Sequence, residues 1–235
     1  MTSHLHRILA CALIAGCGRG FYDNVPDAPP KRPVDAPPVV PLAHAGTFAV
    51  QADSSVTTSI RFSARATHTR DAIVIYTVCG GTYVPTGVSI AAQGWQFVPL
   101  SGQIDTMSIH AASFGAIAPN TQAADFAVDW TMPFGCQGTD VVADEFTGTD
   151  PVNPFDTPIE AATCSGTTMA PPSAGGAVWA ACAQVGAGAS PGSGFSAGAD
   201  DGLGVAAWFA QTDTARTITV ANASLLSAVN LLPPH

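Results

Sequence analysis

Charged side chains are scarce in this sequence. They make up 11% of its 235 residues, Lys31 is the only lysine, and Glu145 and Glu160 are the only glutamates. Helices of soluble proteins usually draw their polar face from Lys, Glu, Gln and Arg. The shortage of these residues argues against a helical protein. Thr, Ser, Val, Ala and Gly stand in their place, and this composition favours strands and turns.

Basic residues are especially few in the part of the chain that is expected to fold. From Gly46 onward, fourteen acidic residues stand against four arginines. Such a surface repels phosphate backbones, and the sequence has no basic stripe of the kind that nucleic-acid binding requires. Nucleic acids are therefore not expected as partners, whereas cations and neutral glycans remain open.

The N-terminal apolar run is too short to cross a membrane. It extends from Ile8 to Gly16, whereas a spanning helix needs about 20 apolar residues. The basic start at His4, His6 and Arg7, the apolar run and two small residues before Cys17 follow the plan of a secretory signal. We therefore expect an exported protein.

The end of this run, Ile14-Ala15-Gly16-Cys17, resembles the lipobox of bacterial lipoproteins, in which an aliphatic residue and two small residues precede a cysteine. The resemblance implies that a peptidase removes residues 1–16 and that Cys17, acylated, becomes the first residue. Two or more acyl chains hold a protein stably on a membrane. Gly18 stands where an Asp would suggest inner-membrane retention, so we expect the outer membrane or cell surface. The alternative is an ordinary secretory signal with an incidental Cys17.

Residues 17–45 are expected to be a linker. Seven prolines lie from Pro26 to Pro41, both included, and the sequence Asp-Ala-Pro-Pro occurs twice. Proline fixes its own torsion and biases the preceding residue toward extended conformations, which predicts a semi-rigid spacer. A P-x-x-P ligand for a partner domain is the alternative.

Residues 46–235 are expected to form one β-sandwich domain. Short apolar or alternating segments are separated by Gly, Pro, Asn and Asp. Val56 to Ala66 alternates like a half-buried strand, and Ala72 to Cys79 is apolar on both faces, which predicts a central strand. Val88 to Ala91 and Trp95 to Val98 suggest a hairpin around Gln93-Gly94. About ten strands without a helix predict an antiparallel two-sheet sandwich.

The order of these features resembles jelly-roll or immunoglobulin-like sandwich modules of secreted bacterial proteins and lipoproteins. The resemblance rests on Ile73 to Gly81, Gln93-Gly94-Trp95, Glu145-Phe146-Thr147-Gly148 with Asp150-Pro151 and Asn153 to Asp156, and the last strand, Leu225 to Leu232. It implies a fold and an extracellular setting, and it supplies no active site.

Four cysteines lie beyond the lipobox, an even number that reads as two disulfides in an exported protein. Of the three pairings, we predict Cys164 with Cys182 and Cys79 with Cys136, because the first pair falls on strands that look like neighbours. Each bridge contributes about 3 to 4.5 kcal/mol in the chain-entropy treatment. A zinc site is the rival interpretation, although the sequence has no C-x-x-C pair.

The acidic residues around the Glu145 segment are the strongest candidates for chemistry. If 140–146 is a strand, Asp140 and Asp144 share one face and Glu145 takes the other. Asp150 and Asp156 lie in the following loop and, with Asn153, are candidate Ca²⁺ ligands, because calcium prefers oxygen ligands. Solvated surface carboxylates are the alternative, and no other cofactor is expected.

Two further motifs resemble functional sites. Trp95 lies beside Gln93 and Gln96 near the expected hairpin tip, and an exposed tryptophan flanked by amides can stack on a sugar ring. Half-buried packing is the alternative. Gly188-Ala189-Ser190-Pro191-Gly192 has the G-x-S-x-G form of a hydrolase nucleophile, but no helix is expected after it, so we interpret it as a loop.

Together these features predict a lipid-anchored, surface-exposed and non-catalytic protein of the bacterial envelope, whose sandwich serves binding, adhesion or envelope structure and contacts a glycan or another surface protein. One alternative is a secreted glycan-active or other hydrolase that uses Asp144 and Glu145, although adjacent strand residues point to opposite faces. Another is a subunit of a surface protein complex.

Overall fold

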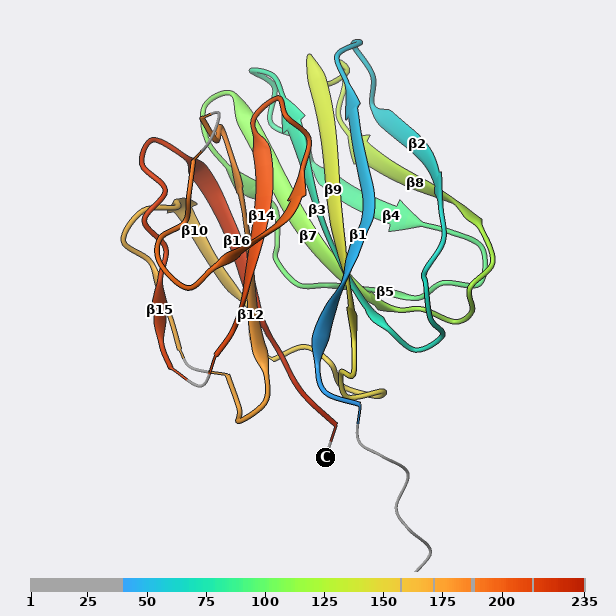
Figure 1. Cartoon of the computed structure of the whole chain (residues 1–235). Helices are drawn as coiled ribbons and strands as arrows, with labels where there is room; N and C mark the ends of the chain where they lie inside the picture. The colour runs from blue at the N-terminus through green and yellow to red at the C-terminus, as the bar shows by residue number, and fades with distance from the viewer. Residues whose placement is uncertain (1–39, 157, 171, 187–188, 213, 235) are drawn as a thin grey trace, which may run out of the picture. The chain divides into compact units, whose positions relative to one another are not determined.

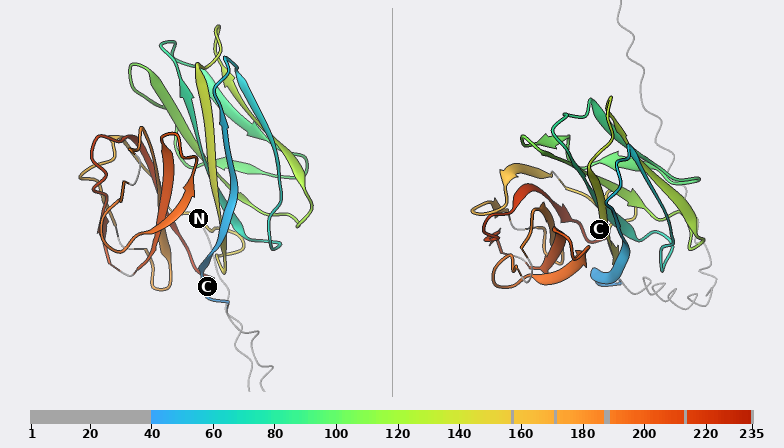
Figure 2. Two further views of the ribbon diagram at one scale, coloured as in Figure 1. Left: turned by 45° about the horizontal axis from the view of Figure 1, so that its top comes forward. Right: turned by 90° about the horizontal axis from the view of Figure 1, so that it is seen from above.

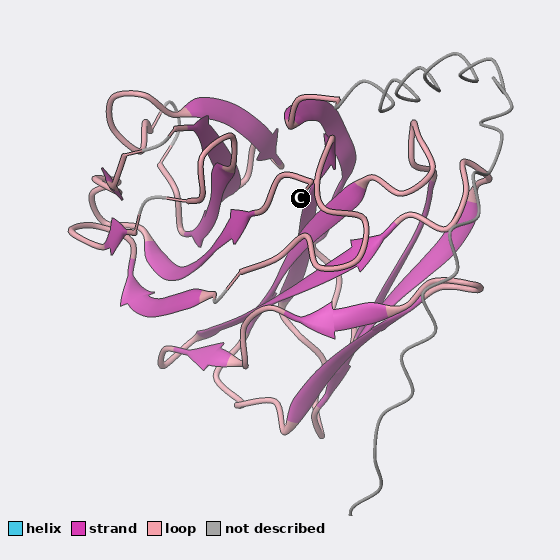
Figure 3. Ribbon diagram, turned by 90° about the horizontal axis from the view of Figure 1, so that it is seen from below, coloured by secondary structure: helices cyan, strands magenta, loops and turns pink. Residues whose placement is uncertain are grey.

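The computed structural model describes residues 40–156, 158–170, 172–186, 189–212 and 214–234. The predicted signal peptide, Cys17 and most of the predicted linker lie outside these ranges. The described chain consists of strands, turns and loops, and it contains no helix (Figure 3). The strands are β1 (Ala43–Asp53), β2 (Ser59–Ala64), β3 (Ala72–Gly80), β4 (Gly87–Ala91), β5 (Phe97–Pro99), β6 (Ile104–Asp105), β7 (Ile109–Ile117), β8 (Ala124–Thr131), β9 (Gly138–Thr147), β10 (Ile159–Thr163), β11 (Thr168–Met169), β12 (Ala177–Ala183), β13 (Ser196–Asp200), β14 (Val205–Gln211), β15 (Arg216–Thr217) and β16 (Ser224–Leu231).

These strands form four antiparallel sheets. The central sheet has the order β1-β9-β3-β7-β5, with β6 also paired to β7. The outer sheet has the order β2-β8-β4, and the C-terminal sheet has the order β10-β16-β12-β14-β13. Strands β11 and β15 form a short ribbon. Figure 1 shows the central sheet between the outer sheet and the C-terminal sheet, and Figure 2 shows the same order from two other directions.

Each interface between sheets has its own hydrophobic core. On β3, Ile73 and Ile75 contribute to the core that the central sheet shares with the outer sheet. Val74 and Tyr76, the alternate residues, contribute to the core shared with the C-terminal sheet. A third core lies on the far face of the C-terminal sheet, where Val178 and Ile218 pack. The central sheet is thus buried on both faces, which explains why β3 is apolar throughout.

The prediction of an all-β, antiparallel sandwich is confirmed. Strand β3 lies between β9 and β7, as its apolar sequence predicts. Strand β2 also buries one face, with Ile60 3% exposed, whereas Arg61 on the other face is exposed. The strand begins only at Ser59, and Val56, which the alternation placed on the buried face, is 74% exposed.

Two details of the predicted architecture differ. The strands are divided among four sheets rather than two, because both the central and the C-terminal sheet are covered on each face. The predicted hairpin around Gln93-Gly94 is wrong: β4 pairs with β8 in the outer sheet, whereas β5 pairs with β7 in the central sheet. The turn at Gln93-Gly94 therefore carries the chain from one sheet to another.

The described cysteines form the two predicted disulfides, Cys79 with Cys136 and Cys164 with Cys182. The reason given for the second bridge was incorrect, because β16 lies between β10 and β12. Cys164 follows the end of β10, where the chain has left the sheet, and it reaches Cys182 on β12 in the third core.

Candidate functional site

Strand β9 carries acidic side chains to both faces of the central sheet. Side chains alternate along a strand, so Asp140 and Asp144 face the C-terminal sheet, with Val142 and Phe146 in the core between the two sheets. Glu145 takes the opposite face, on the side of Val141 and Ala143. The predicted assignment of faces is confirmed. Asp144 and Glu145 therefore cannot act as acid and base on the same bond.

Asp144 is fully buried, and N–H groups from three other strands surround it. Its Oδ1 lies 2.9 Å from Nε2 of His44 on β1. Its Oδ2 accepts hydrogen bonds from Nε1 of Trp179 at 2.9 Å and from the backbone N–H of Ala199 at 3.2 Å. A Cβ atom at Gly198 would lie 2.5 Å from Oδ2, so only glycine fits there. The carboxylate thus ties the central sheet to the C-terminal sheet.

Asp140 lies beside a second carboxyl group, whereas Asp144 is surrounded by N–H donors. It is hydrogen-bonded to Asp201, which lies between β13 and β14 and whose Oδ1 accepts the backbone N–H groups of Leu203, Gly204 and Val205. Burial raises the pKa of Asp140 to about 7, and the neighbouring Asp201 adds to the effect. Asp140 lines a cavity of about 390 Å³.

A third cluster of ionisable side chains lies where the β2–β3 loop meets the other face of β9. His68, Asp71 and Glu145 place their ligand atoms within 4.8 Å of one another, and no other group of three or more His, Cys, Asp or Glu side chains in the described ranges meets in this way. Nδ1 of His68 lies 3.0 Å from Oδ2 of Asp71. Asp71 and Glu145 are 4% and 2% exposed, whereas the His68 side chain is 65% exposed.

Backbone groups fix this cluster in place. Oε1 of Glu145 accepts the N–H groups of Thr67 at 2.8 Å and His68 at 3.3 Å. Asp71 is hydrogen-bonded to Glu145, and burial raises its pKa to about 6, with a further increase from the Glu145 carboxyl. The set of one imidazole and two carboxyls is a candidate metal centre.

Neither predicted calcium ligand belongs to this cluster. Oδ1 of Asp150 accepts the backbone N–H groups of Val152 and Asn153, each at 2.8 Å, and so shapes its own turn. The N–H of Asp156 donates to the carbonyl of Asn230. Calcium binding by Asp150 and Asp156 stays a prediction.

Of the two interpretations of Trp95, packing holds and exposure does not, because the residue is 8% exposed and lies in an aromatic cluster. Its ring centroid is 5.7 Å from that of Phe48 and 5.1 Å from that of Phe126. It cannot present an open face to a sugar ring. It does line a cavity of about 430 Å³, together with Gln93, Asn120, Gln122, Ala123, Ala124 and Asp125.

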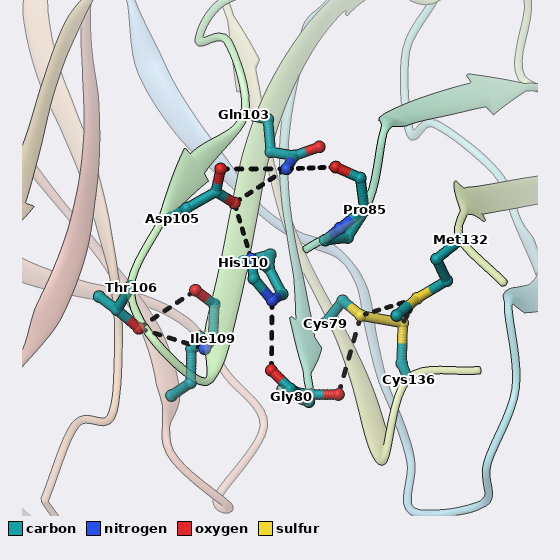
Figure 4. A network of polar contacts seen from close by, with 11 residues as sticks. Cys79, Gly80, Pro85, Gln103, Asp105, Thr106, Ile109, His110, Met132 and Cys136 are labelled. Atoms are coloured by element: carbon teal, nitrogen blue, oxygen red, sulfur yellow. Dashed lines mark hydrogen bonds and ion pairs between the residues drawn. A yellow bond between two sulfur atoms is a disulfide. The ribbon is translucent and has the colours of Figure 1, made fainter. Parts of the chain in front are cut away.

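A separate polar network surrounds His110, which is completely buried on β7 (Figure 4). Nδ1 lies 2.7 Å from Oδ1 of Asp105, and Nε2 lies 3.2 Å from the carbonyl oxygen of Gly81. Gln103 donates to Asp105 and to the carbonyl of Pro85. The network joins β6, β7 and the loop after β3, and we interpret it as structural.

Sequence reasoning missed His68 and Asp71. The only local signal is the spacing His68-x-x-Asp71 directly before an apolar strand. Glu145 comes from 74 positions further along the chain, so only the pairing of β3 with β9 brings the three together.

No helix in the described ranges is long and apolar enough to cross a membrane. Comparison with protein-family models, with curated proteins and with solved structures finds no match for this chain.

Proposed function

We propose that this protein is an exported lipoprotein, held at the bacterial envelope by lipid on Cys17, and that its sandwich is a non-catalytic binding or structural module. The observation that supports this proposal best is the pairing of all four described cysteines in disulfides. Such bonds persist in oxidising compartments and are rare in the cytosol of mesophiles. The lipobox-like sequence that ends at Cys17 accounts for both export and anchoring.

Phase partitioning and mass spectrometry of the full chain, expressed in a bacterium, test this proposal. The wild-type protein is expected to enter the detergent phase and to start at an acylated Cys17. Cys17→Ser is expected to stay in the aqueous phase or to retain residues 1–16. Cys11→Ser is the matched control, because it removes a cysteine from the leader and leaves the acylated residue intact. Wild-type protein that is unacylated, or whose four remaining cysteines alkylate without reduction, would contradict the proposal.

A second candidate function is the binding of a hydroxyl-rich ligand such as a neutral glycan. The cavity at Trp95 favours it, because Gln93, Asn120, Gln122 and Asp125 line this cavity together with the largely buried Trp95. Amide and carboxylate groups of this kind hydrogen-bond to hydroxyls.

Glycan-array binding by the full chain tests this second candidate. Gln93→Ala and Asp125→Ala are expected to weaken binding of any glycan found by up to about tenfold each, through the loss of about one hydrogen bond to the glycan. Gln96→Ala is the matched control, because Gln96 flanks Trp95 in sequence but does not line this cavity. An equal loss of glycan binding in Gln96→Ala, or the absence of any bound glycan, would contradict the proposal that this cavity binds glycans.

A further inference from the structure

We propose that His68, Asp71 and Glu145 form a binding site for one divalent transition-metal ion, with Zn²⁺ as the preferred ion. The inference is independent of the proposed export and anchoring. It rests on three side chains of two separate segments, the β2–β3 loop and β9, whose ligand atoms converge within 4.8 Å.

The spacing of these atoms is close to that of a coordination shell. Ligand atoms that lie about 2.0 to 2.2 Å from a shared zinc ion are about 3 to 4 Å apart. Nδ1 of His68 and Oδ2 of Asp71 are already 3.0 Å apart. The upper limit of 4.8 Å for the whole set exceeds this spacing by about 1 Å. His68 is the exposed member, so an adjustment of its side chain would not disturb the core.

The charges of the cluster also call for a cation. Two carboxyl groups, each more than nine-tenths buried, are hydrogen-bonded to each other. Buried charges are costly unless they are paired or coordinate a metal. The next basic group along the loop, Arg70, directs its guanidinium to the carbonyl of Pro151, 3.5 Å away. His68 is the basic side chain in contact with the pair, and a bound divalent ion would neutralise both carboxylates.

The surrounding backbone holds the ligands in place before any ion arrives. The N–H groups of Thr67 and His68 fix Glu145, and the hydroxyl of Thr147 hydrogen-bonds to Asp71. The loop is also bound to the end of β7, because the Arg70 N–H donates to the carbonyl of Ala118 and the Ala118 N–H donates to the carbonyl of Asp71. Outer hydrogen bonds of this kind orient metal ligands and commonly change affinity by about 10- to 100-fold.

The donor set selects the class of ion. An imidazole nitrogen and two carboxylate oxygens suit zinc and other late transition metals, whereas Ca²⁺ takes six to eight oxygen ligands. The carboxyl pair of Asp140 and Asp201 has no histidine within the cluster and is absent from the metal-ligand group found in the described ranges. It therefore offers a natural control. The exposed His68 leaves a route from solvent and room for water as a further ligand.

Thermal unfolding and calorimetric titration of the full chain, purified in detergent and stripped with EDTA, test the proposal. A hundredfold excess of Zn²⁺ over its Kd is expected to raise the Tm by about 5 to 10 °C. His68→Ala and Glu145→Gln are each expected to weaken zinc binding by roughly 10-fold or more. Mn²⁺ is expected to bind more weakly than Zn²⁺. Any response of the Tm to Ca²⁺ is expected to be the same in His68→Ala as in the wild type, because calcium takes oxygen ligands.

Two variants serve as matched controls. Thr69→Ala changes the exposed neighbour of His68 on the same loop without removing a ligand, and Asp140→Asn disrupts the other carboxyl pair. Both are expected to bind Zn²⁺ like the wild type. Because His68 is exposed, His68→Ala reports on the site even if Glu145→Gln fails to fold. The proposal is overturned if the wild type shows no zinc response, if His68→Ala responds fully, or if either control loses the response.

Discussion

The buried carboxyl groups on the two faces of β9 have different hydrogen-bond partners. On the face toward the C-terminal sheet, Asp144 is surrounded by N–H donors from Trp179, Ala199 and His44. On the face toward the outer sheet, Glu145 accepts two backbone N–H groups but also contacts the carboxyl of Asp71. One buried acid thus has only donors around it, whereas its neighbour in sequence shares its site with a second acid.

This difference separates a structural carboxylate from a candidate ligand. A cation can bind a carboxylate whose oxygens are all matched by buried donors only by displacing those donors, which would then be left unsatisfied. Two carboxyl groups in contact repel each other when both are ionised, and a bound proton or metal ion removes that repulsion. Asp144 therefore belongs to the packing of the two large sheets, and Glu145 belongs to the proposed metal site.

The largest effect is expected at Asp144. Asp144→Ala is expected to lower the free energy of unfolding by about 3 to 5 kcal/mol, because it leaves buried donors without an acceptor. Asp144→Asn is expected to cost about 2 kcal/mol, because its amide group places N–H against N–H on one side. Urea unfolding measures both values.

Asp129→Asn is the matched control for Asp144. Asp129 forms an ion pair with Arg61 in which both side chains are substantially exposed, at 46% and 60%. Such a pair contributes less than about 1 kcal/mol. A cost at Asp144 no larger than that at Asp129 would mean that the donors around Asp144 find water or other partners.

The carboxyl pair on the Asp144 side of β9 predicts a pH dependence. Asp140 has a pKa of about 7 in the folded protein, above the value of about 4 for an unfolded Asp. The folded state therefore retains a proton that the unfolded state releases, and stability from this group falls as the pH rises from about 4 to 7. Asp140→Asn is expected to add about 1 kcal/mol, or 2 to 4 °C in Tm, at pH 8, after discounting for solvent exposure, and nothing near pH 4. Equal gains at both pH values would contradict this account.

Local patterns in the sequence predicted the strands better than their assignment to sheets. The unbroken apolar run of β3 and the alternation around Ile60 and Phe126 were enough to place a central strand and two half-buried ones. The hairpin predicted around Gln93-Gly94 was wrong, because connections within one sheet and connections between two sheets use the same turn residues. Exposure of Trp95 was one of its two interpretations for the same reason, because the tip of a hairpin faces solvent, whereas the connection between sheets carries Trp95 into the core.

The candidate site was harder to predict than the fold. Alternation along β9 correctly assigned Asp144 and Glu145 to opposite faces, because that rule is local. The contact of Glu145 with His68 and Asp71 depends on the register of β3 against β9, in which Glu145 lies opposite Ile73. No pattern within either segment encodes that register, so only the structure brings the proposed metal ligands together.

A carboxyl-to-amide change is expected to be mild at Glu145, in contrast to Asp144. Glu145→Gln keeps an oxygen for the N–H groups of Thr67 and His68 and gains an N–H donor for Asp71. In metal-free protein at neutral pH, we expect a change of less than about 1 kcal/mol in the free energy of unfolding. Urea unfolding beside Asp144→Asn measures the contrast, and equal costs for the two variants would remove the distinction between the two faces.

The smallest effect is expected at His68. Its side chain is 65% exposed, and surface substitutions usually change stability by no more than about 0.5 kcal/mol. In EDTA-treated protein, His68→Ala is therefore expected to unfold like the wild type. With Zn²⁺ present, the two proteins are expected to separate, because only the wild type gains stability from the ion. A large loss in metal-free protein would show that the imidazole already stabilises the two carboxyls by itself, and His68 would then be a structural partner like His44 rather than a ligand.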